Sequence, residues 1–299
     1  MSNETIKIRN KLNLIGAASC WGARDRRCDQ SPDILRKKGI ETALTRAELT
    51  VSWLQNIYPK ALHISDRKDI DHVVDLCRQL AVTVDKVVRN NEYFAVIGGD
   101  HSCAMGTWSG AATALEHKGP LGLVWIDAHM DSHVPETSPS DALHGMPLAC
   151  LFGYGIKELT DIGKAGPHLA PHHVCLVGVR QYEPEEANLL ETLGVRVFFM
   201  DEIKERGLEA VMTDALSIVK NGTAGFGVSL DLDAIDPVDA PGVGTPVHDG
   251  ITAHALLAVL PKIKRDPLFI GAEITEMNPY RDVQNKTVDL TIDLLHTMF

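Results

Sequence analysis

One stretch of the sequence, LGLVWIDAHMDSH at residues 121–133, constrains the fold more than any other. Its apolar part, Leu121 to Ile126, is typical of a strand buried on both faces, and it ends abruptly in Asp127, His129 and Asp131. Open α/β sheets place their chemistry at such strand ends. If the chain stays extended past Asp127, residues two apart project to the same side and these three groups converge. Such convergence indicates a metal site, and a solvated polar loop is the alternative.

Two further stretches repeat this pattern. His101 follows a short strand through Ile97 and two glycines, and the strand beginning at Phe226 ends in Asp231 and Asp233. The glycine turn before His101 is not followed by the Gly-Lys-Ser/Thr ending of a phosphate loop, which argues against a nucleotide site. Asp236, directly before Pro237, is expected to cap a turn rather than to bind a ligand.

The order of apolar segments predicts the fold class. At least seven strand-like segments alternate with helical ones, and apolar residues at spacings of three and four indicate a long amphipathic helix over residues 70–88. This alternation predicts a three-layer α/β/α fold with a mostly parallel sheet, formed by residues 1–299 as a single domain. The order of the strands in the sheet is not set by the sequence alone.

Composition narrows the class of protein. The net charge of −11 argues against nucleic-acid binding, which needs a basic surface. The polar N-terminus lacks an apolar signal region and no segment is long enough to span a membrane, so a cytoplasmic protein is expected. The six scattered cysteines are expected to be reduced and structural, forming neither disulfides nor a zinc site. No acidic residues flank three histidines that are expected at the surface: His168, His172 and His173.

The groups at the predicted strand ends imply a binuclear centre. Four carboxylates and two imidazoles cannot gather without cations, because like charges oppose joint ionisation, and two divalent ions would neutralise them. Oxygen-rich ligation with imidazole and no thiolate favours Mn²⁺, with iron, cobalt or nickel as alternatives. Two metal ions acidify and orient a water molecule, so the implied reaction is a hydrolysis. The candidate ligands are His101, Asp127, His129, Asp131, Asp231 and Asp233.

Six motifs together resemble the ureohydrolase family, and within it most closely the arginases. They are GGDHS (98–102), DAHMD (127–131), HGMP (144–147), SLDLDAIDP (229–237), GTPV (244–247) and EMNP (276–279). The resemblance implies two Mn²⁺ ions per subunit and a small guanidino substrate, which a metal-bound hydroxide cleaves to urea and an amine. It also implies that Asp127 and Asp231 bridge the two ions. One ion would be held by His101, Asp127, Asp131 and Asp231, and the other by His129, Asp127, Asp231 and Asp233.

The same resemblance assigns the catalytic and substrate-binding residues. Glu276 would pair with the guanidinium, His144 would shuttle a proton, and Asp131 would serve both as ligand and as catalytic residue. Outside this family context, a strand-end salt bridge would explain Glu276 and a backbone-bonded loop histidine would explain His144. The predicted substrate contacts are His133, Ser140, Glu183, Thr245 and Glu276.

Departures from the arginase pattern leave the substrate open. His133 and Ala142 stand where arginases typically have asparagine, and Glu183 and Glu273 stand where they have the shorter aspartate. Loss of two amide contacts weakens recognition of an α-carboxylate by about 1 kcal/mol each. L-Arginine is the preferred substrate. The alternatives are another guanidino or formimino compound (agmatine, a guanidino acid or formiminoglutamate) and a catalytically silent scaffold. By resemblance the protein is expected to be a homo-oligomer, a trimer or a hexamer.

Overall fold

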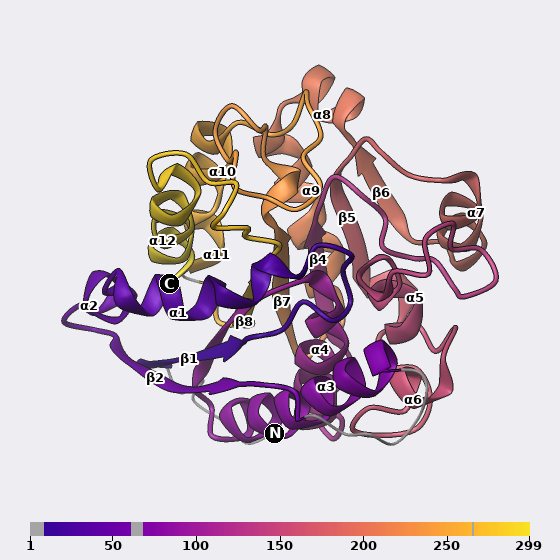
Figure 1. Ribbon diagram of the computed structural model, residues 1–299, viewed down its shortest axis with the longest axis horizontal. Coiled ribbons are helices and arrows are strands. Elements are labelled where there is room, and N and C mark those ends of the chain that lie inside the picture. Colours follow the sequence, from indigo (N-terminus) through magenta and orange to yellow (C-terminus); the bar gives the residue numbers. More distant parts are fainter. Residues whose placement is uncertain (1–8, 61–67, 265) are drawn as a thin grey trace.

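The computed structural model describes residues 9–60, 68–264 and 266–299, which fold around one parallel sheet (Figure 1). The sheet has eight strands in the order β2-β1-β3-β8-β7-β4-β5-β6, and every neighbouring pair is parallel. Its strands are β1 (Lys11–Ala17), β2 (Thr50–Ile57), β3 (Tyr93–Gly98), β4 (Leu121–Ile126), β5 (Val174–Val179), β6 (Arg196–Phe199), β7 (Gly225–Asp231) and β8 (Phe269–Thr275).

Helices cover both faces of the sheet (Figure 1). One layer consists of α1 (Ser31–Lys37), α2 (Ile40–Leu44), α8 (Met200–Arg206), α9 (Leu208–Lys220), α10 (Ala253–Val259), α11 (Pro261–Lys264) and α12 (Lys286–Met298). The opposite layer contains α3 (Lys68–Arg89), α4 (Ala104–Leu115), α5 (Pro147–Leu151) and α7 (Pro184–Leu193), and α6 (Lys157–Thr160) lies beside α5. The predicted three-layer α/β/α fold is confirmed.

Successive side chains along β4 point alternately to the two helix layers. Leu123 and Trp125 pack toward α3 and α4, whereas Val124 and Ile126 pack toward α9, and all four side chains are fully buried. A strand enclosed on both faces has no polar face, which is why the sequence here is a continuous apolar run.

Close packing of α3 against α4 depends on glycine. Gly106 and Gly110 of α4 lie directly against the backbone of α3, and a Cβ atom at Gly106 would be 2.6 Å from the carbonyl oxygen of Cys77. No side chain separates the two helices at these points. This contact fixes α4, whose N-terminus follows His101.

Four expectations from the sequence need correction. An eighth strand, β2, was not predicted, because it is an edge strand whose buried, half-buried and exposed residues follow no regular apolar alternation. The chain after Asp127 is not extended but turns, as described below. His168 and His173 are buried rather than at the surface. The backbone N–H of His168 donates to the Leu151 carbonyl, and its Nε2 lies 3.1 Å from the Thr160 carbonyl oxygen.

The fourth correction concerns cysteine. Cys20 and Cys28 form a disulfide, whereas the other four cysteines are buried and free. The 3₁₀ turn over Arg26–Gln30 folds the chain back on itself, so that the Cα atoms of the two cysteines are 5.7 Å apart despite eight positions of separation. This spacing is the usual one for a disulfide.

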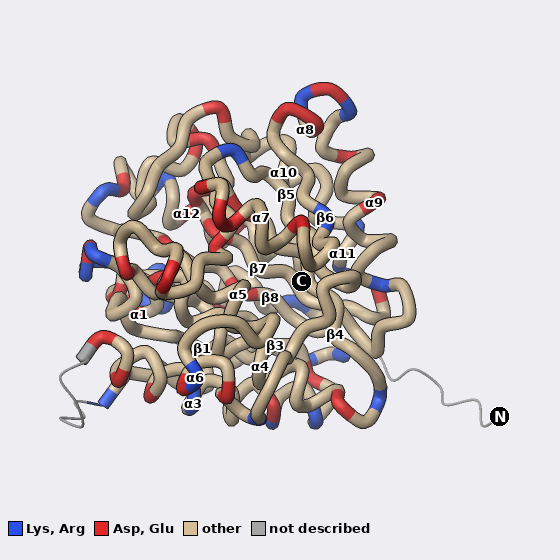
Figure 2. Tube along the Cα trace, turned by 90° about the vertical axis from the view of Figure 1, so that its right-hand side faces the viewer, with Lys and Arg blue, Asp and Glu red and all other residues tan. Residues whose placement is uncertain are grey.

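Acidic and basic positions are interspersed along the chain trace, and acidic positions gather near the start of α7 (Figure 2). Within the described residues, no helix combines the length and the apolar character needed to cross a bilayer.

Candidate functional site

The sheet order brings the polar strand ends together. Strands β3, β8, β7, β4 and β5 are consecutive neighbours in the sheet, and because all are parallel their carboxyl ends meet at one edge. The residues that follow them are His101 after β3, Glu276 after β8, Asp231 and Asp233 at the end of β7, Asp127 to Asp131 after β4, and Glu183 after β5.

Local turns, rather than an extended backbone, direct these side chains toward one another. The Asp127 carboxylate accepts a 2.7 Å hydrogen bond from the backbone N–H of His129, and Asp231 accepts one of 2.8 Å from Asp233. Asp100 receives the same type of bond, at 2.9 Å, from Ser102. An aspartate that bonds the N–H two residues ahead bends the chain sharply. The expected convergence therefore occurs, but through a repeated turn at three strand ends.

His101 stands at the centre of the first group of candidate ligands. Its Nδ1 lies 3.2 Å from Asp127, 3.0 Å from Asp131 and 3.1 Å from Asp231, all measured to a carboxylate oxygen. Although fully buried, this nitrogen has no hydrogen-bond partner of acceptable geometry. Ligands about 2.1 Å from a divalent cation in near-octahedral geometry are about 3 Å apart, so this spacing fits a shared ion.

A second group adjoins the first. The Nδ1 atom of His129 lies 3.2 Å from an oxygen of Asp233 and 3.5 Å from one of Asp127. Because Asp127 belongs to both groups, two cation positions would share this carboxylate. The structure thus brings all six predicted ligands together, although Asp231 falls only within the His101 group.

The charges of the cluster are compatible with bound cations. Burial and the nearby Asp127 raise the pKa of Asp131 to about 6, and burial with Asp233 and Asp127 raises the pKa of Asp231 well above its ordinary value. No ion pair among the described residues joins any of the four aspartates to lysine or arginine. The donors therefore fit divalent metal ions, which oxygen and imidazole ligands bind without thiolates.

A buried network holds His101 from behind. Its Nε2 lies 3.0 Å from the hydroxyl of Ser229, which in turn donates a 3.0 Å bond to Glu273. The indole N–H of Trp108 also donates to Glu273, and the imidazole stacks on Trp125 at 4.2 Å. Such partners orient a ligating imidazole. Sequence reasoning noted Glu273 only as a departure and missed Ser229, although both lie on strands that end at the site.

Arg180 is a second supporting residue that the sequence did not reveal. Its guanidinium donates to five backbone carbonyls, including those of Asp233 at 2.7 Å and Val247 at 2.8 Å. Burial lowers the pKa of this arginine. The side chain ties the metal-ligand segment after β7 to the loop that contains Thr245. Its position directly after β5 was the only available signal.

His144 and Glu276 form a pair beside the metal-ligand cluster. The Nδ1 of His144 lies 2.9 Å from Glu276 Oε1, which also accepts a 2.8 Å bond from the backbone N–H of His101. Burial alone would lower the pKa of His144, but the charge of Glu276 and its hydrogen bond outweigh burial and raise this pKa to about 9. With this pKa, His144 carries a proton at neutral pH that it could donate.

Two residues of the site have unusual backbone geometry. Asp131 and Glu276 have φ angles of 49° and 64°, in the left-handed region that residues other than glycine seldom adopt. Both positions are buried, and the surrounding hydrogen bonds hold them in place. Such strain concentrates at functional sites.

A cavity of about 230 Å³ opens onto the cluster. His144 and Thr245 line it near the metal ligands, and its far end is bounded by His133, Ser140 and Glu183. Glu276 is not among the lining residues and lies behind His144. Four residues of the lining were not among the predicted site residues: Pro139, Gly145, Gln181 and Glu186.

Three ionisable groups meet at the far end of the cavity. His133 Nε2 is 3.1 Å from Glu183 and 3.4 Å from Glu186, and its Nδ1 is 3.1 Å from the Thr137 hydroxyl. Burial raises the pKa of Glu186 to about 8. The capping-box spacing of Glu183 and Glu186 at the start of α7 could have identified Glu186 from the sequence.

Comparison with known proteins agrees with this geometry. The profile described as Arginase family matches residues 10–299. The arginase of Bacillus caldovelox is 36% identical over 96% of this chain and 97% of its own, and that of Brevibacillus brevis is 34% identical over 98% of each chain. The crystal structure of Bacillus subtilis arginase superposes with a TM-score of 0.90 at 32% identity, covering 97% of this chain and 98% of its own.

An Entamoeba histolytica arginase solved in complex with L-ornithine gives a TM-score of 0.88 at 27% identity, with coverage of 97% of this chain and 98% of its own. The family match extends over nearly the whole chain and includes every candidate ligand. The chain therefore belongs to the arginase family, whose members are hydrolases acting on C–N bonds of linear amidines.

Proposed function

We propose that this protein is a binuclear manganese hydrolase that cleaves the guanidino group of L-arginine to urea and L-ornithine. The observation that carries the proposal is the pair of buried donor groups sharing Asp127, next to the His144–Glu276 pair. His101, Asp127, Asp131 and Asp231 would hold one ion, and His129, Asp127, Asp231 and Asp233 the other. When bound, the two cations would acidify a water molecule and orient it for attack on carbon.

Glu276 would bind the guanidinium of the substrate, and His144 would transfer a proton. A guanidinium that reaches Glu276 replaces the His144 N–H on Oε1 and forms a charge-assisted bond there. The released imidazole loses the negative partner that raises its pKa, so it gives up its proton more readily. His144 would then protonate the leaving amine, which is the step that makes C–N cleavage possible.

The distal cavity would hold the amino-acid end of the substrate. Ser140 and Thr245 offer hydrogen-bonding groups, and Glu183 offers a carboxylate for the α-ammonium. His133 also lines this region, with its ring nitrogens next to Thr137 and Glu183. The cavity of about 230 Å³ limits the substrate to a small molecule. We further infer that the whole chain works as one domain in the cytoplasm, within a homo-oligomer.

A second substrate is favoured by a specific contact. The two glutamates engage His133 at Nε2, and no lysine or arginine lines the distal cavity in the described part of the chain. A carboxylate there would face Glu183, whereas an amine would pair with it. This arrangement favours a guanidino compound that ends in an amine, such as agmatine, as the alternative to L-arginine.

Urea release from L-arginine tests the proposal directly. Protein reloaded with Mn²⁺, its metal content counted by mass spectrometry, should release urea, and His144→Ala should lower kcat by about 10²- to 10⁴-fold while two ions stay bound. Agmatine and a guanidino acid are assayed in parallel. If fully loaded protein turns over none of the three, the hydrolase proposal is wrong; if agmatine exceeds arginine, only the substrate changes.

A further inference from the structure

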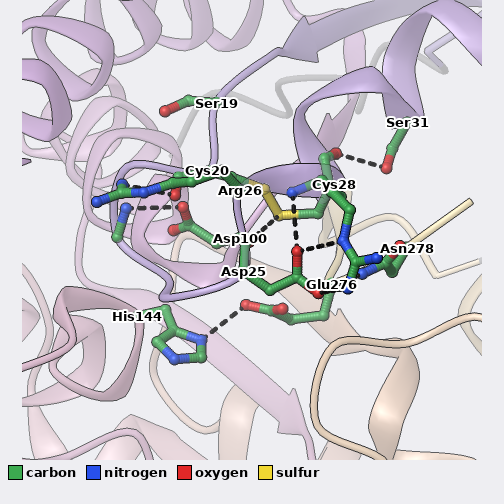
Figure 3. The surroundings of a disulfide bond; sticks show 12 residues. Ser19, Cys20, Asp25, Arg26, Cys28, Ser31, Asp100, His144, Glu276 and Asn278 are labelled. Carbon is green, nitrogen blue, oxygen red and sulfur yellow. Dashed lines mark hydrogen bonds and ion pairs between the residues drawn. A yellow bond between two sulfur atoms is a disulfide. The ribbon is translucent and has the colours of Figure 1, made fainter. Parts of the chain in front are cut away.

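Residues 19–31, here called the strap, connect β1 to α1 and pass beside the catalytic pair (Figure 3). The Cys20–Cys28 disulfide joins the two ends of the strap. Figure 3 shows this disulfide next to Asp100, with Glu276 and His144 nearby. The metal cluster and the mechanism proposed above make no use of these cysteines.

The first half of the strap packs against Asp100 and His144. The backbone N–H of Gly22 donates a 2.8 Å bond to the buried Asp100 carboxylate, and the Gly22 carbonyl accepts a 3.1 Å bond from the backbone N–H of His144. A Cβ atom at Gly22 would be 2.5 Å from Asp100 Oδ1 and from the Ser102 hydroxyl oxygen. The strap backbone therefore rests directly on the turn that carries His101 and supports the backbone of His144.

The second half packs against the segment after β8. The Ser31 hydroxyl oxygen lies 2.6 Å from the carbonyl oxygen of Met277, directly after Glu276, and 2.7 Å from that of Cys28, and it can donate its one proton to either. The Asp25 carboxylate accepts a 3.2 Å bond from the side chain of Asn278. One half of the strap thus supports His144 and the other supports the neighbours of Glu276, and the disulfide fixes the two halves relative to each other.

The disulfide is buried, with Cys20 and Cys28 each 2% exposed, but it lies beside a cavity. Cys20 lines a cavity of about 320 Å³, together with Ser19, Trp21, Arg26, Asp29, Tyr58, Ala18 and Pro59. The four free cysteines line neither this cavity nor the substrate cavity. Disulfides in proteins of reducing compartments are usually transient and serve redox sensing or catalysis. The position of this one, between the surface cavity and the catalytic pair, fits a sensing role.

We propose that Cys20–Cys28 is a reversible thiol–disulfide site whose oxidised form holds the strap against His144 and Glu276, and whose reduction lowers turnover. This inference rests on the proposed hydrolase function. The thiolate of a small thiol attacks Cys20 Sγ, the sulfur–sulfur bond breaks, and Cys28 leaves as a thiolate that takes up a proton. A second thiolate attacks the sulfur of the bound thiol, releasing Cys20 and a small-molecule disulfide. Two electrons pass from the two thiols to the protein pair.

Reduction acts on the backbone of His144. Without the disulfide the two halves of the strap are joined only through the chain between them, so the conformational freedom of the strap rises. The bond from His144 to the Gly22 carbonyl then opens more often, and the imidazole is less well positioned. Misplacement of a catalytic group by about 1 Å costs as much as 10²-fold, and we expect a fall in kcat of about tenfold.

The test compares oxidised and reduced protein, both loaded with Mn²⁺. Protein treated with glutathione disulfide should yield a linked Cys20–Cys28 peptide and full urea release. Treatment with a phosphine reductant should lower kcat about tenfold at unchanged metal content, and reoxidation should restore it. The double variant Cys20→Ser/Cys28→Ser should stay at the reduced rate under both conditions, whereas Cys150→Ser should respond like the unmodified protein.

Amide hydrogen exchange separates this inference from the proposed function. Exchange at His144, whose N–H bonds to Gly22, should be faster in the reduced protein and in the double variant, whether or not a substrate has been found. Equal exchange in both redox states, equal kcat in both states, or the absence of a linked peptide after oxidation would each overturn the inference. Lack of turnover in every state, with exchange that still differs, would overturn the hydrolase function alone.

Discussion

At the scale of single residues, Glu276 controls the protonation of His144. The His144 pKa of about 9 results from the carboxylate 2.9 Å away, which outweighs the opposing effect of burial. Without that charge, only the Asp100 and Asp131 carboxylates oppose the effect of burial, so the pKa of His144 in Glu276→Gln should fall from about 9 toward its ordinary value of 6.5. NMR titration of the His144 ring in metal-free protein measures this shift.

Because the folded-state pKa is raised, the ion pair stabilises the fold below pH 6.5, and this contribution is lost as the pH rises through about 9. In Glu276→Gln, the free energy of unfolding should no longer decrease for this reason as the pH rises from 6.5 to about 9. Glu183→Gln is the matched control, since Glu183 contacts His133 rather than His144. An unchanged His144 titration midpoint in Glu276→Gln would contradict the assignment.

His133 is the residue through which we expect substrate preference to change. In the structure its Nε2 contacts Glu183 and Glu186, so it offers little to a carboxylate. His133→Asn replaces the imidazole with a free amide donor, and one added hydrogen bond of about 1 kcal/mol should lower KM for L-arginine about fivefold with little change in kcat. Steady-state kinetics measures both constants. Agmatine, which has no carboxylate, is the control substrate, and its KM should not change in His133→Asn. An equal decrease in KM for agmatine would contradict this role of His133.

At the scale of elements, the contact between α3 and α4 depends on small residues. In Gly106→Ala the new Cβ would lie 2.6 Å from the Cys77 carbonyl oxygen and 2.7 Å from its Cα, so the two helices must separate. Overpacking of this kind costs about 1–3 kcal/mol, which lowers Tm by several degrees in a protein of this size. Differential scanning calorimetry measures the change. Val82→Ala on the exposed side of α3 should leave Tm nearly unchanged, and a Gly106→Ala protein as stable as this control would show that the helices have room to spare.

The elements that the sequence predicted best are those with a strong period or an abrupt end. The apolar run before Asp127 and the helical spacing over residues 70–88 correspond to β4 and α3. Edge strand β2 was not predicted because its buried and exposed residues do not alternate regularly. Its pairing with β1 also depends on residues that are distant in sequence. The metal-ligand candidates at the strand ends were predicted, whereas Glu186, Ser229 and Arg180 were not, because they act through contacts that only the folded chain creates.

The disulfide is another feature that the sequence pattern did not predict. Composition and the expected compartment argued for reduced cysteines, and no short paired spacing pointed to Cys20 and Cys28. Their proximity results from the 3₁₀ turn over Arg26–Gln30, which Asp25 begins by accepting a bond from the N–H of Arg27. A local turn of this kind is set by side-chain bonds rather than by periodicity, so pattern reasoning did not detect it.

At the scale of the whole molecule, bound cations should contribute to stability. The four aspartates are buried close together and repel one another without metal, so chelation should lower Tm and Mn²⁺ should restore it. At a free metal concentration of 1,000 times Kd the gain is about 4 kcal/mol per site. Calorimetry of loaded and chelated protein measures it. Asp127→Asn alters the carboxylate shared by both groups, so Mn²⁺ should raise the Tm of this variant by less. An equal increase in Tm would mean that the stabilising ions bind elsewhere.

This stabilisation should also depend on pH in a defined direction. Asp131, with a pKa raised to about 6, is protonated in the metal-free protein at low pH, which relieves repulsion, and the protons compete with metal. The metal-free fold therefore loses stability as the pH rises through about 6. The Tm difference between loaded and metal-free protein should consequently increase from pH 5 to pH 8, and a difference that shrinks over this range would contradict the charge assignment.

The order of strands has a consequence for how the molecule is made. β7 and β8, the last strands in the chain, occupy the middle of the sheet between β3 and β4. A nascent polypeptide that still lacks them on the ribosome can pair β1 with β2 and β3, and β4 with β5 and β6, but these two halves share no strand-to-strand contact. His101 and Asp127 then belong to separate halves. Metal-binding competence therefore arises only when the final quarter of the polypeptide has emerged, and a prematurely terminated product cannot acquire it.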